Sequence, residues 1–273
     1  MKLVSFSIEG RSGFGAIEGD EIRELSSPDV PDLKTALAVG LPAGSVRTLR
    51  LADITLAPPI PNPGKIFCVG LNYVEHREET GRAATAHPTI FTRFADTQVA
   101  HGAPLIVPRE SEKFDFEGEL AVIIGKPGRR ISEADALSHV AGYACYNDGS
   151  VRDWQNHTAQ FTPGKNFPGT GGFGPWMVTA DELPDPAVMS VTTRLNGQVV
   201  QHAPVSDMIF PIPKVIAYLS AFTMLSPGDV ISTGTPGGVG AKRNPPLWMK
   251  PGDVVEVDIS GIGVLRNPVI ADR

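Results

Sequence analysis

The sequence is poor in cysteine and contains no long apolar run. Its two cysteines, Cys68 and Cys145, lie far apart in the 273 residues, which argues against a disulfide framework or a cysteine-based zinc site. No apolar stretch approaches the length of a membrane span. The N-terminus reaches Glu9 and Arg11 too soon for a secretory signal peptide. We therefore expect a cytoplasmic protein without a membrane partner.

An excess of positive charge is also absent. The formal net charge is −6 and the pI is about 5.5, which argues against binding to nucleic acid or to an anionic membrane. Glycine and proline are instead abundant, with 29 and 25 residues, and hydrophobic residues make up 41% of the chain. This composition is typical of a folded, turn-rich protein with many short strands.

A proline-rich segment, residues 57–64, divides the chain. Its prolines exclude a helix and disfavour a central strand. Before it, residues 3–25 alternate between apolar and polar around glycines and predict small hairpins, and residues 32–38 predict a short helix. We therefore expect a small N-terminal β-rich domain over residues 1–60 and a larger domain over residues 61–273.

The segment 114–125 predicts a strand with acidic side chains on one face. Asp115, Glu117 and Glu119 recur with period two, and from Leu120 onward both faces are apolar, as in a strand that enters a core. Like charges on one face repel unless a cation or a proton lies between them. A solvated strand face is the alternative, but the inward course of the strand favours a cation site.

Other polar residues follow predicted strands and turns. His76 and Glu79 are spaced i, i+3 on a predicted helical turn, so they are either a functional pair or two surface neighbours. Asp148 follows the predicted strand 142–146 and fits a third acidic ligand or a helix N-cap. Further predicted elements are a helix from Ser132 to about residue 140, an apolar helix at 214–224, a strand at 230–232 and a closing hairpin from strands 253–259 and 262–266.

Two glycine-rich segments complete the pattern. Residues 162–176 are too rich in glycine and proline for regular structure, and they predict a functional loop whose only cation is Lys165. This segment lacks the ending of a P-loop. Residues 233–240 either present backbone N–H groups to an anion or form a simple turn.

In their order along the chain, these motifs resemble the fumarylacetoacetate hydrolase superfamily, in particular its acylpyruvase and 2-hydroxyhepta-2,4-diene-1,7-dioate isomerase-like branch. The resemblance covers about residues 64–270, while residues 1–57 match only loosely. It implies an α+β, mainly β fold, a mixed β-sandwich roll with few helices, assembled as a homodimer. The matching segments are 69–73 with His76, 115–120, 147–148 with Arg152, Asp153 and Gln155, 164–165 with Phe167, 206–210, 232–240 and 251–256.

The resemblance also implies a set of site residues. It implies a divalent cation, magnesium or manganese with calcium as a further alternative, and oxygen ligands suit such hard cations. Lys165 is expected to point at the substrate and to contribute little to folding, as an exposed lysine does. The implied roles are metal ligand for Glu117, Glu119 and Asp148, catalytic for His76, Glu79 and Lys165, and substrate-binding for Arg152, Gln155 and Thr235.

The implied reaction is hydrolytic cleavage of a C–C bond in a 2,4-dioxo acid, an acylpyruvate or fumarylacetoacetate-like β-diketone from aromatic-compound catabolism. His76, oriented by Glu79, would activate water, and Lys165 would stabilise the oxyanion. The alternative at the same site is an oxaloacetate-type decarboxylase or a 2-hydroxyhepta-2,4-diene-1,7-dioate isomerase. A catalytically inactive member would lack one of the metal ligands, His76 or Lys165, and this chain has them all. Residues 166–172 depart from the family pattern, which leaves the substrate's side chain open.

Overall fold

The computed structural model describes residues 1–272, which form a mainly β fold with mixed sheets and few helices, as predicted. Three of the strand pairs, β6–β17, β8–β14 and β9–β19, are parallel, and the others are antiparallel. Across the larger sheet the strands are β4 (Arg47–Arg50), β3 (Glu21–Glu24), β2 (Arg11–Glu18), β1 (Lys2–Ile8), β14 (Gly171–Thr179), β12 (Val140–Asp148), β11 (Gly118–Ile124), β17 (Val230–Ser232), β6 (Ile66–Gly70) and β7 (Thr89–Arg93), with β5 (Thr55–Leu56) paired to β1 and β8 (Gln98–Val99) to β14.

A second sheet packs against the central strands of the first. A short pair, β10 (Phe114–Asp115) with β13 (Ser150–Val151), lies apart from both sheets. No helix within residues 1–272 combines the length and the apolar character that a membrane crossing requires. The strands of the second sheet are β16 (Gln198–Pro204), β15 (Ser190–Leu195), β18 (Val254–Ile259), β19 (Gly263–Ala271) and β9 (Leu105–Val107), and the α-helices are α1 (Leu33–Val39), α2 (Val74–Thr80), α3 (Arg152–Gln155), α4 (Thr162–Lys165) and α5 (Ile212–Phe222).

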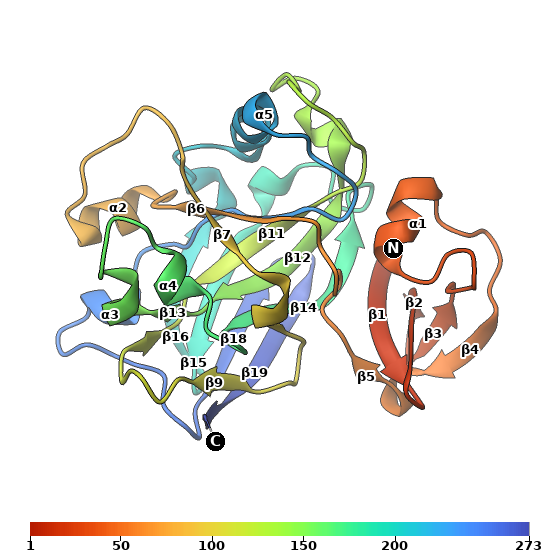
Figure 1. Cartoon of the computed structure of the whole chain (residues 1–273), viewed down its shortest axis with the longest axis horizontal. Coiled ribbons are helices and arrows are strands. Elements are labelled where there is room, and N and C mark those ends of the chain that lie inside the picture. The colour runs from red at the N-terminus through yellow and green to blue at the C-terminus, as the bar shows by residue number, and fades with distance from the viewer. Residues whose placement is uncertain (273) are drawn as a thin grey trace.

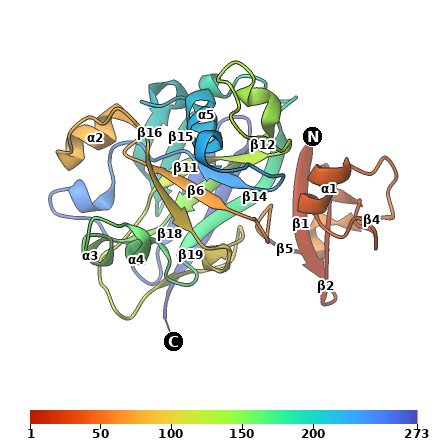
Figure 2. The ribbon, with the colours of Figure 1, turned by 45° about the horizontal axis from the view of Figure 1, so that its top comes forward.

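The N-terminal strands stand beside the rest of the molecule (Figures 1 and 2). The predicted hairpins are present as β1–β3, and the predicted short helix is α1, whose N-cap Asp32 accepts a hydrogen bond from the Thr35 backbone N–H. However, β1 continues the larger sheet, because Lys2 and Leu3 pair with β14. The sheet therefore crosses the expected boundary at residue 60, and the division into two domains stays a prediction.

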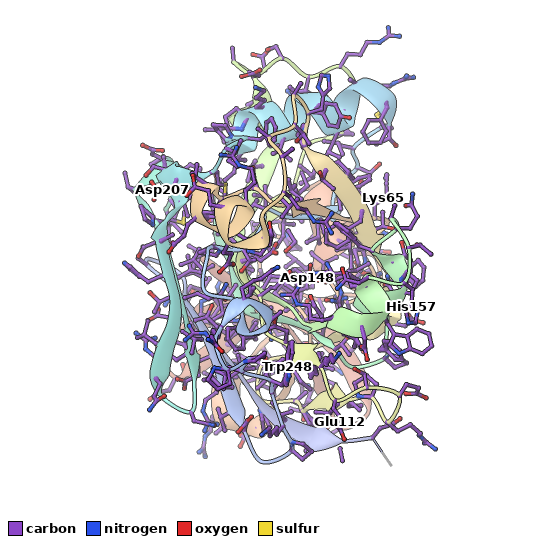
Figure 3. The ribbon with its side chains drawn as sticks, turned by 90° about the vertical axis from the view of Figure 1, so that its left-hand side faces the viewer. Lys65, Glu112, Asp148, His157, Asp207 and Trp248 are labelled. Atoms are coloured by element: carbon purple, nitrogen blue, oxygen red, sulfur yellow. The ribbon has the colours of Figure 1, made fainter. Side chains whose placement is uncertain are left out.

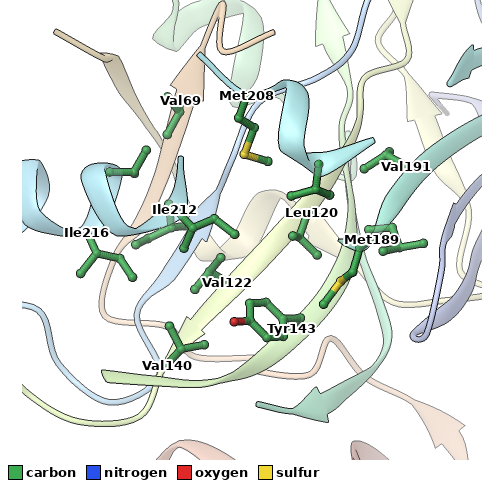
Figure 4. Close-up of a cluster of buried hydrophobic side chains, with 14 of the residues drawn as sticks. Val69, Leu120, Val122, Val140, Tyr143, Met189, Val191, Met208, Ile212 and Ile216 are labelled. Carbon is green, nitrogen blue, oxygen red and sulfur yellow. The ribbon is translucent and has the colours of Figure 1, made fainter. Parts of the chain in front are cut away.

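The core lies on both sides of β11. Leu120, Val122 and Ile124 pack with α5 and the second sheet (Figure 4), whereas Ala121 and Ile123 pack on the other side with residues of β1, β2 and α1. Because successive side chains of a strand point to opposite faces, a strand buried on both faces must be apolar throughout. The predicted entry of this segment into the core is confirmed.

Two predicted elements differ from the structure. The helix expected from Ser132 is only a short 3-10 helix, Ala136–His139, although the Asp135 backbone N–H donates to Ser132 Oγ as in the predicted cap. The irregular loop expected over 162–176 contains α4 and most of β14. Glycine suits this strand because of close packing: a Cβ on Gly171 would lie 2.4 Å from the Gln98 side-chain oxygen.

Candidate active site

Three buried carboxylates meet where β11 and β12 lie side by side. Glu117 precedes β11, Glu119 lies within it, and Asp148 ends β12. The Asp148 backbone N–H donates to the Glu117 carbonyl over 2.8 Å, which fixes the register. One carboxylate oxygen from each of the three residues lies within 4.8 Å of the others. The structure thus brings together the three residues that the sequence predicted as metal ligands.

Asp115 does not join this cluster, although it was expected on the same strand face. The predicted strand is interrupted between β10 and β11, so the period-two alternation does not continue through Phe116 and Glu117. Asp115 instead accepts hydrogen bonds from Arg152 Nε at 2.8 Å and from the backbone N–H groups of Gly240 and Ala241. Its role is to hold these segments together beside the cluster.

Lys165 is fully inside the protein and contacts the cluster directly. Its Nζ lies 2.6 Å from Glu117 Oε2 and 2.6 Å from Asp148 Oδ2, and the residue is 1% exposed. The expectation of an exposed lysine is therefore wrong. Gly164 permits this placement, since a Cβ there would lie 2.4 Å from the Gln155 backbone nitrogen, where α4 packs on α3.

A second buried cation, Arg93, was missed by the sequence-based predictions. Its Nη1 lies 2.7 Å from Asp148 Oδ1 and also donates to the Gly149 carbonyl, and its Nη2 donates to the Thr170 hydroxyl. It ends β7, a strand that is otherwise half-buried. The available signal was weak: a single arginine at the end of a short strand of mixed polarity, outside the acidic motif.

Glu119 is the carboxylate without a cation. It accepts hydrogen bonds from Ser232 Oγ at 2.5 Å and from the Gly234 backbone N–H at 2.8 Å. Burial, together with the charges of Asp148 and Glu117, raises the pKa of Glu119 well above its ordinary value. Burial acts the same way on Glu117, but Arg152 and Lys165 outweigh it and lower the pKa of Glu117.

These contacts leave the site short of positive charge. Four buried carboxylates (those of Asp115, Glu117, Glu119 and Asp148) face three buried cations (Arg93, Arg152 and Lys165). The two groups that donate to Glu119, a hydroxyl and a backbone N–H, are neutral. One carboxylate oxygen from each of Glu117, Glu119 and Asp148 can reach a common point, and such oxygen ligands suit a hard divalent cation. The residues present therefore fit the divalent cation that the sequence implied, and Glu117, Glu119 and Asp148 are the ones that can hold it.

His76 and Glu79 form the predicted pair on α2. His76 Nδ1 lies 2.6 Å from Glu79 Oε1, and Glu79 Oε2 accepts the backbone N–H of Gly238 at 2.9 Å. Both side chains face the same side of α2 because they are three residues apart. Glu79 is thus held at both oxygens, which fixes the orientation of the imidazole ring.

The glycine-rich segment 233–240 does bind anions, and these anions are the protein's own side chains. The backbone N–H groups of Gly234, Gly238 and Gly240 donate to Glu119, Glu79 and Asp115 respectively. Gly234 and Gly238 have φ of 106° and 98°, which favours glycine. One loop therefore orients a cluster carboxylate and the histidine's partner together.

A cavity of about 520 Å³ lies beside His76 and Arg152. His76, Arg152 and Gln155 line it, and Arg152 also reaches Glu117 Oε1 at 2.6 Å, so this arginine connects the cavity to the carboxylates. In Figure 3, which looks onto the side that carries α2 and α3, Asp148 lies near the middle of the view with Trp248 below it. Trp248 is another residue of the cavity wall.

The three predicted substrate-binding residues differ in their surroundings. Gln155 Oε1 accepts from Arg152 Nη1 at 2.9 Å, while Arg152 Nη2 is buried without a hydrogen-bond partner among the described residues. That orphaned donor is suited to a ligand. Thr235 is not among the side chains that line the cavity, and its hydroxyl bonds to the Gly118 carbonyl and the Gln201 amide. Its predicted contact with substrate stays untested.

Comparisons with known proteins cover the entire chain. Residues 65–270 match the family model described as fumarylacetoacetate hydrolase C-terminal, and residues 1–59 match one described as Rv2993c-like, N-terminal. The chain is 39% identical to the oxaloacetate tautomerase fahd2, mitochondrial, of Xenopus laevis, over 99% of this chain and 90% of that protein. It is 40% identical to the human oxaloacetate tautomerase FAHD2A, mitochondrial, over 87% of this chain and 74% of that protein.

Solved structures of similar sequence share the fold. A fumarylacetoacetate hydrolase from Exiguobacterium antarcticum superposes with a TM-score of 0.88 at 35% identity, with both chains fully covered. A 2-hydroxyhepta-2,4-diene-1,7-dioate isomerase from Mycobacterium marinum superposes with a TM-score of 0.84 at 34% identity, over all of this chain and 99% of that one. These similar proteins thus include a hydrolase, an isomerase and tautomerases, and the two solved structures share one architecture with this chain.

Proposed function

This chain belongs to the fumarylacetoacetate hydrolase family, and on that premise we propose that it interconverts the keto and enol forms of a 2-oxo dicarboxylic acid of the oxaloacetate type. The relatives named above as oxaloacetate tautomerases match nearly the whole chain, and they favour the alternative isomerase reading over C–C hydrolysis. The sequence had suggested a decarboxylase or a dienedioate isomerase as that alternative, so tautomerisation is a refinement of it.

The observation that carries the proposal is the His76–Glu79 pair at the wall of the cavity that leads to the carboxylates. With the Nδ1 hydrogen donated to Glu79, the Nε2 atom of His76 keeps its lone pair and can accept a proton. Tautomerisation needs one such group acting in turn as base and acid: a proton leaves C3 of the keto acid for His76 Nε2, and the protonated His76 then returns a proton to the oxygen on C2. The reverse direction uses the same groups, so no atom is gained or lost.

A divalent cation held by Glu117, Glu119 and Asp148 would withdraw electrons from the 2-oxo group and so make the C3 proton more acidic. Lys165 keeps its proton for a physical reason. Burial would lower the pKa of Lys165, but Asp148 and Glu117 outweigh that effect and raise it. The lysine therefore stays a fixed positive charge that holds both carboxylates in place and lowers the pKa of Glu117, and a role as oxyanion donor stays a proposal.

Hydrolytic C–C cleavage is the second candidate, and the full-length likeness to the Exiguobacterium antarcticum hydrolase favours it. The same base would then take a proton from water instead of from carbon. The two reactions differ in what they need beyond the base, because hydrolysis requires room for a water molecule beside the substrate. A homodimeric assembly and a cytoplasmic location also stay proposals, and the tautomerase relatives are named as mitochondrial proteins.

The test is to follow oxaloacetate by NMR with purified protein and Mg²⁺, and to analyse products from acylpyruvates by mass spectrometry in parallel. We expect faster keto–enol exchange in oxaloacetate and little cleavage of acylpyruvates. His76→Ala should slow the exchange by about 10²–10⁴-fold, the usual contribution of a general base. His202→Ala, an exposed histidine on β16, is the matched control and should not change the rate. Rapid acylpyruvate cleavage without faster tautomer exchange would establish the hydrolase instead.

A further inference from the structure

Three cations stand around the cavity with exposed side chains. Arg82, Lys113 and Lys242 line it together with the site residues His76 and Arg152. The chain as a whole carries a net charge of −6, so this gathering of positive charge is local. Asp153 also lines the cavity, and its Oδ1 accepts a hydrogen bond from the Ser111 hydroxyl at 2.7 Å. The positive side chains still outnumber this one acidic lining residue, and a net positive lining attracts anionic ligands.

These cations differ from the buried ones in having no carboxylate partner. Arg152 and Lys165 already contact two carboxylates each, at 2.6–2.8 Å. Among residues 1–272, by contrast, no ion pair joins Arg82, Lys113 or Lys242 to an acidic side chain. Apart from the Arg152 Nη2 donor, the inner cations are therefore paired with the protein's own acidic side chains, whereas the outer cations have no acidic partner among the described residues and can pair with a ligand.

Lys113 and Lys242 are carried on neighbouring, well-anchored backbone. The residue after Lys113 accepts the Met249 backbone N–H at 2.8 Å, and the residue before Lys242 donates its N–H to Asp115 Oδ2 at 2.9 Å. The Lys113 carbonyl itself accepts the Arg152 N–H at 3.0 Å. The two lysines thus extend from the segments that hold Arg152 and Asp115, at the outer side of the inner site.

Arg82 comes from another part of the chain and is also held in place. It follows α2, and its guanidinium carbon lies 5.2 Å from the centre of the Phe161 ring. Phe161 in turn packs edge-on against Phe91, whose ring lies 5.0 Å from Lys165 Nζ. Stacking of this kind orients a guanidinium while leaving its edge free for an anion.

We propose that Lys113 and Lys242, assisted by Arg82, bind the second carboxylate of the substrate and make this protein selective for 2-oxo dicarboxylates over 2-oxo monocarboxylates. This inference rests on the proposed function for the 2-oxo acid end, which would bind at the inner site. The far carboxylate then binds outside the inner site, because the inner cations pair with the protein's own acidic side chains and the one unpartnered donor there, Arg152 Nη2, is left for the 2-oxo acid end.

The test compares two ligands of equal length, 2-oxoglutarate and 2-oxopentanoate, which share the 2-oxo acid end and differ in one carboxylate. Binding in the presence of Mg²⁺ is measured by calorimetry for the wild type and for Lys113→Gln, Lys242→Gln and the double variant. We expect the wild type to bind the dianion more tightly, and each substitution to weaken it up to about fivefold, the range of one exposed ion pair. Binding of 2-oxopentanoate should hardly change.

Lys250→Gln is the matched control, because this exposed lysine lies outside the cavity lining. It should leave both affinities unchanged, and higher salt should weaken only the dianion's advantage. Equal losses for both ligands, no loss in the double variant, or no preference for the dianion in the wild type would overturn the proposal. Because the readout is binding, a lysine-dependent preference without oxaloacetate tautomerisation would refute the proposed function and leave the subsite standing.

Discussion

Two buried glutamates in this molecule have opposite surroundings. Glu24, on β3 in the N-terminal region, bonds to Arg11 at 2.6 Å, to Arg47 at 2.8 Å and to a serine hydroxyl. Glu119, on β11, has only a serine hydroxyl and one backbone N–H. Burial would raise both pKa values, yet the arginines lower the pKa of Glu24 to about 2, while the pKa of Glu119 is raised well above its ordinary value.

The difference separates a structural carboxylate from a functional one. A buried charge is tolerated when the protein supplies its counter-charge, and Glu24 has two. Glu119 stands in a cluster that lacks one positive charge, and the fold keeps it there with two neutral donors that both bond to its Oε2 atom. Such a deficit is destabilising unless something else binds, so it indicates a site for a cation from outside the chain.

The largest expected effect tests whether Glu119 is the functional member of this comparison. Glu119→Gln keeps the shape and can still accept from Ser232 and Gly234, but it removes one charge from the cation site. We expect turnover to fall about 10³-fold or more, since a metal contributes several kcal/mol of transition-state stabilisation. Mg²⁺ binding by calorimetry should weaken in parallel, and the metal-free protein should be as stable as the wild type. Full turnover in this variant, or in chelated wild type, would remove the metal assignment.

A second substitution enlarges the charge deficit. Lys165→Met leaves Glu117 and Asp148 buried without their shared cation, so we expect the metal-free protein to lose about 3 kcal/mol or more in its free energy of unfolding. Urea denaturation with and without Mg²⁺ measures this, and added Mg²⁺ should recover part of the loss by binding the folded state. Unchanged stability would mean that Lys165 is as dispensable as an exposed lysine, as the sequence had suggested.

Glu24→Gln tests the structural member. At neutral pH we expect a loss of about 1–3 kcal/mol in unfolding free energy with unchanged turnover, because Arg11 and Arg47 lose a charged partner. Since the folded-state pKa of Glu24 is depressed from 4.5 to about 2, its stabilisation is present above pH 4.5 and disappears as the pH falls towards 2. Denaturation curves across this pH range should therefore converge for wild type and variant. Parallel curves would show that the pKa of Glu24 is not depressed.

The smallest effect is expected from Arg47→Gln. The Arg47 side chain is 43% exposed and Arg11 remains bound to Glu24, so the loss should be about 1 kcal/mol or less at neutral pH. The same denaturation measurements should show its acid loss of stability beginning at a higher pH than in the wild type. A loss as large as that of Glu24→Gln would mean that Arg47 alone compensates the buried charge.

Local patterns predicted most of what depends on neighbours in the chain. The hairpins of β1–β3, the helix after Asp32 and the continuous apolar run of β11 follow from residues close in sequence. The i, i+3 spacing placed His76 beside Glu79. The prediction of an irregular loop over 162–176 was wrong in its second half, which forms most of a strand. Glycine occurs there because the strand packs closely against residues far away in the sequence.

The sequence by itself determined which residue types the site contains, because acidic motifs, a histidine pair and a loop lysine are legible along one chain. Only the tertiary structure decided how their charges balance. It separated Asp115 from the cluster, buried Lys165 in it, added Arg93 from β7 and left Arg82, Lys113 and Lys242 free at the rim. The physical reason is that charge pairing acts over a few ångströms in space, and the partners are brought together by sheet register and loop packing between segments far apart in the chain.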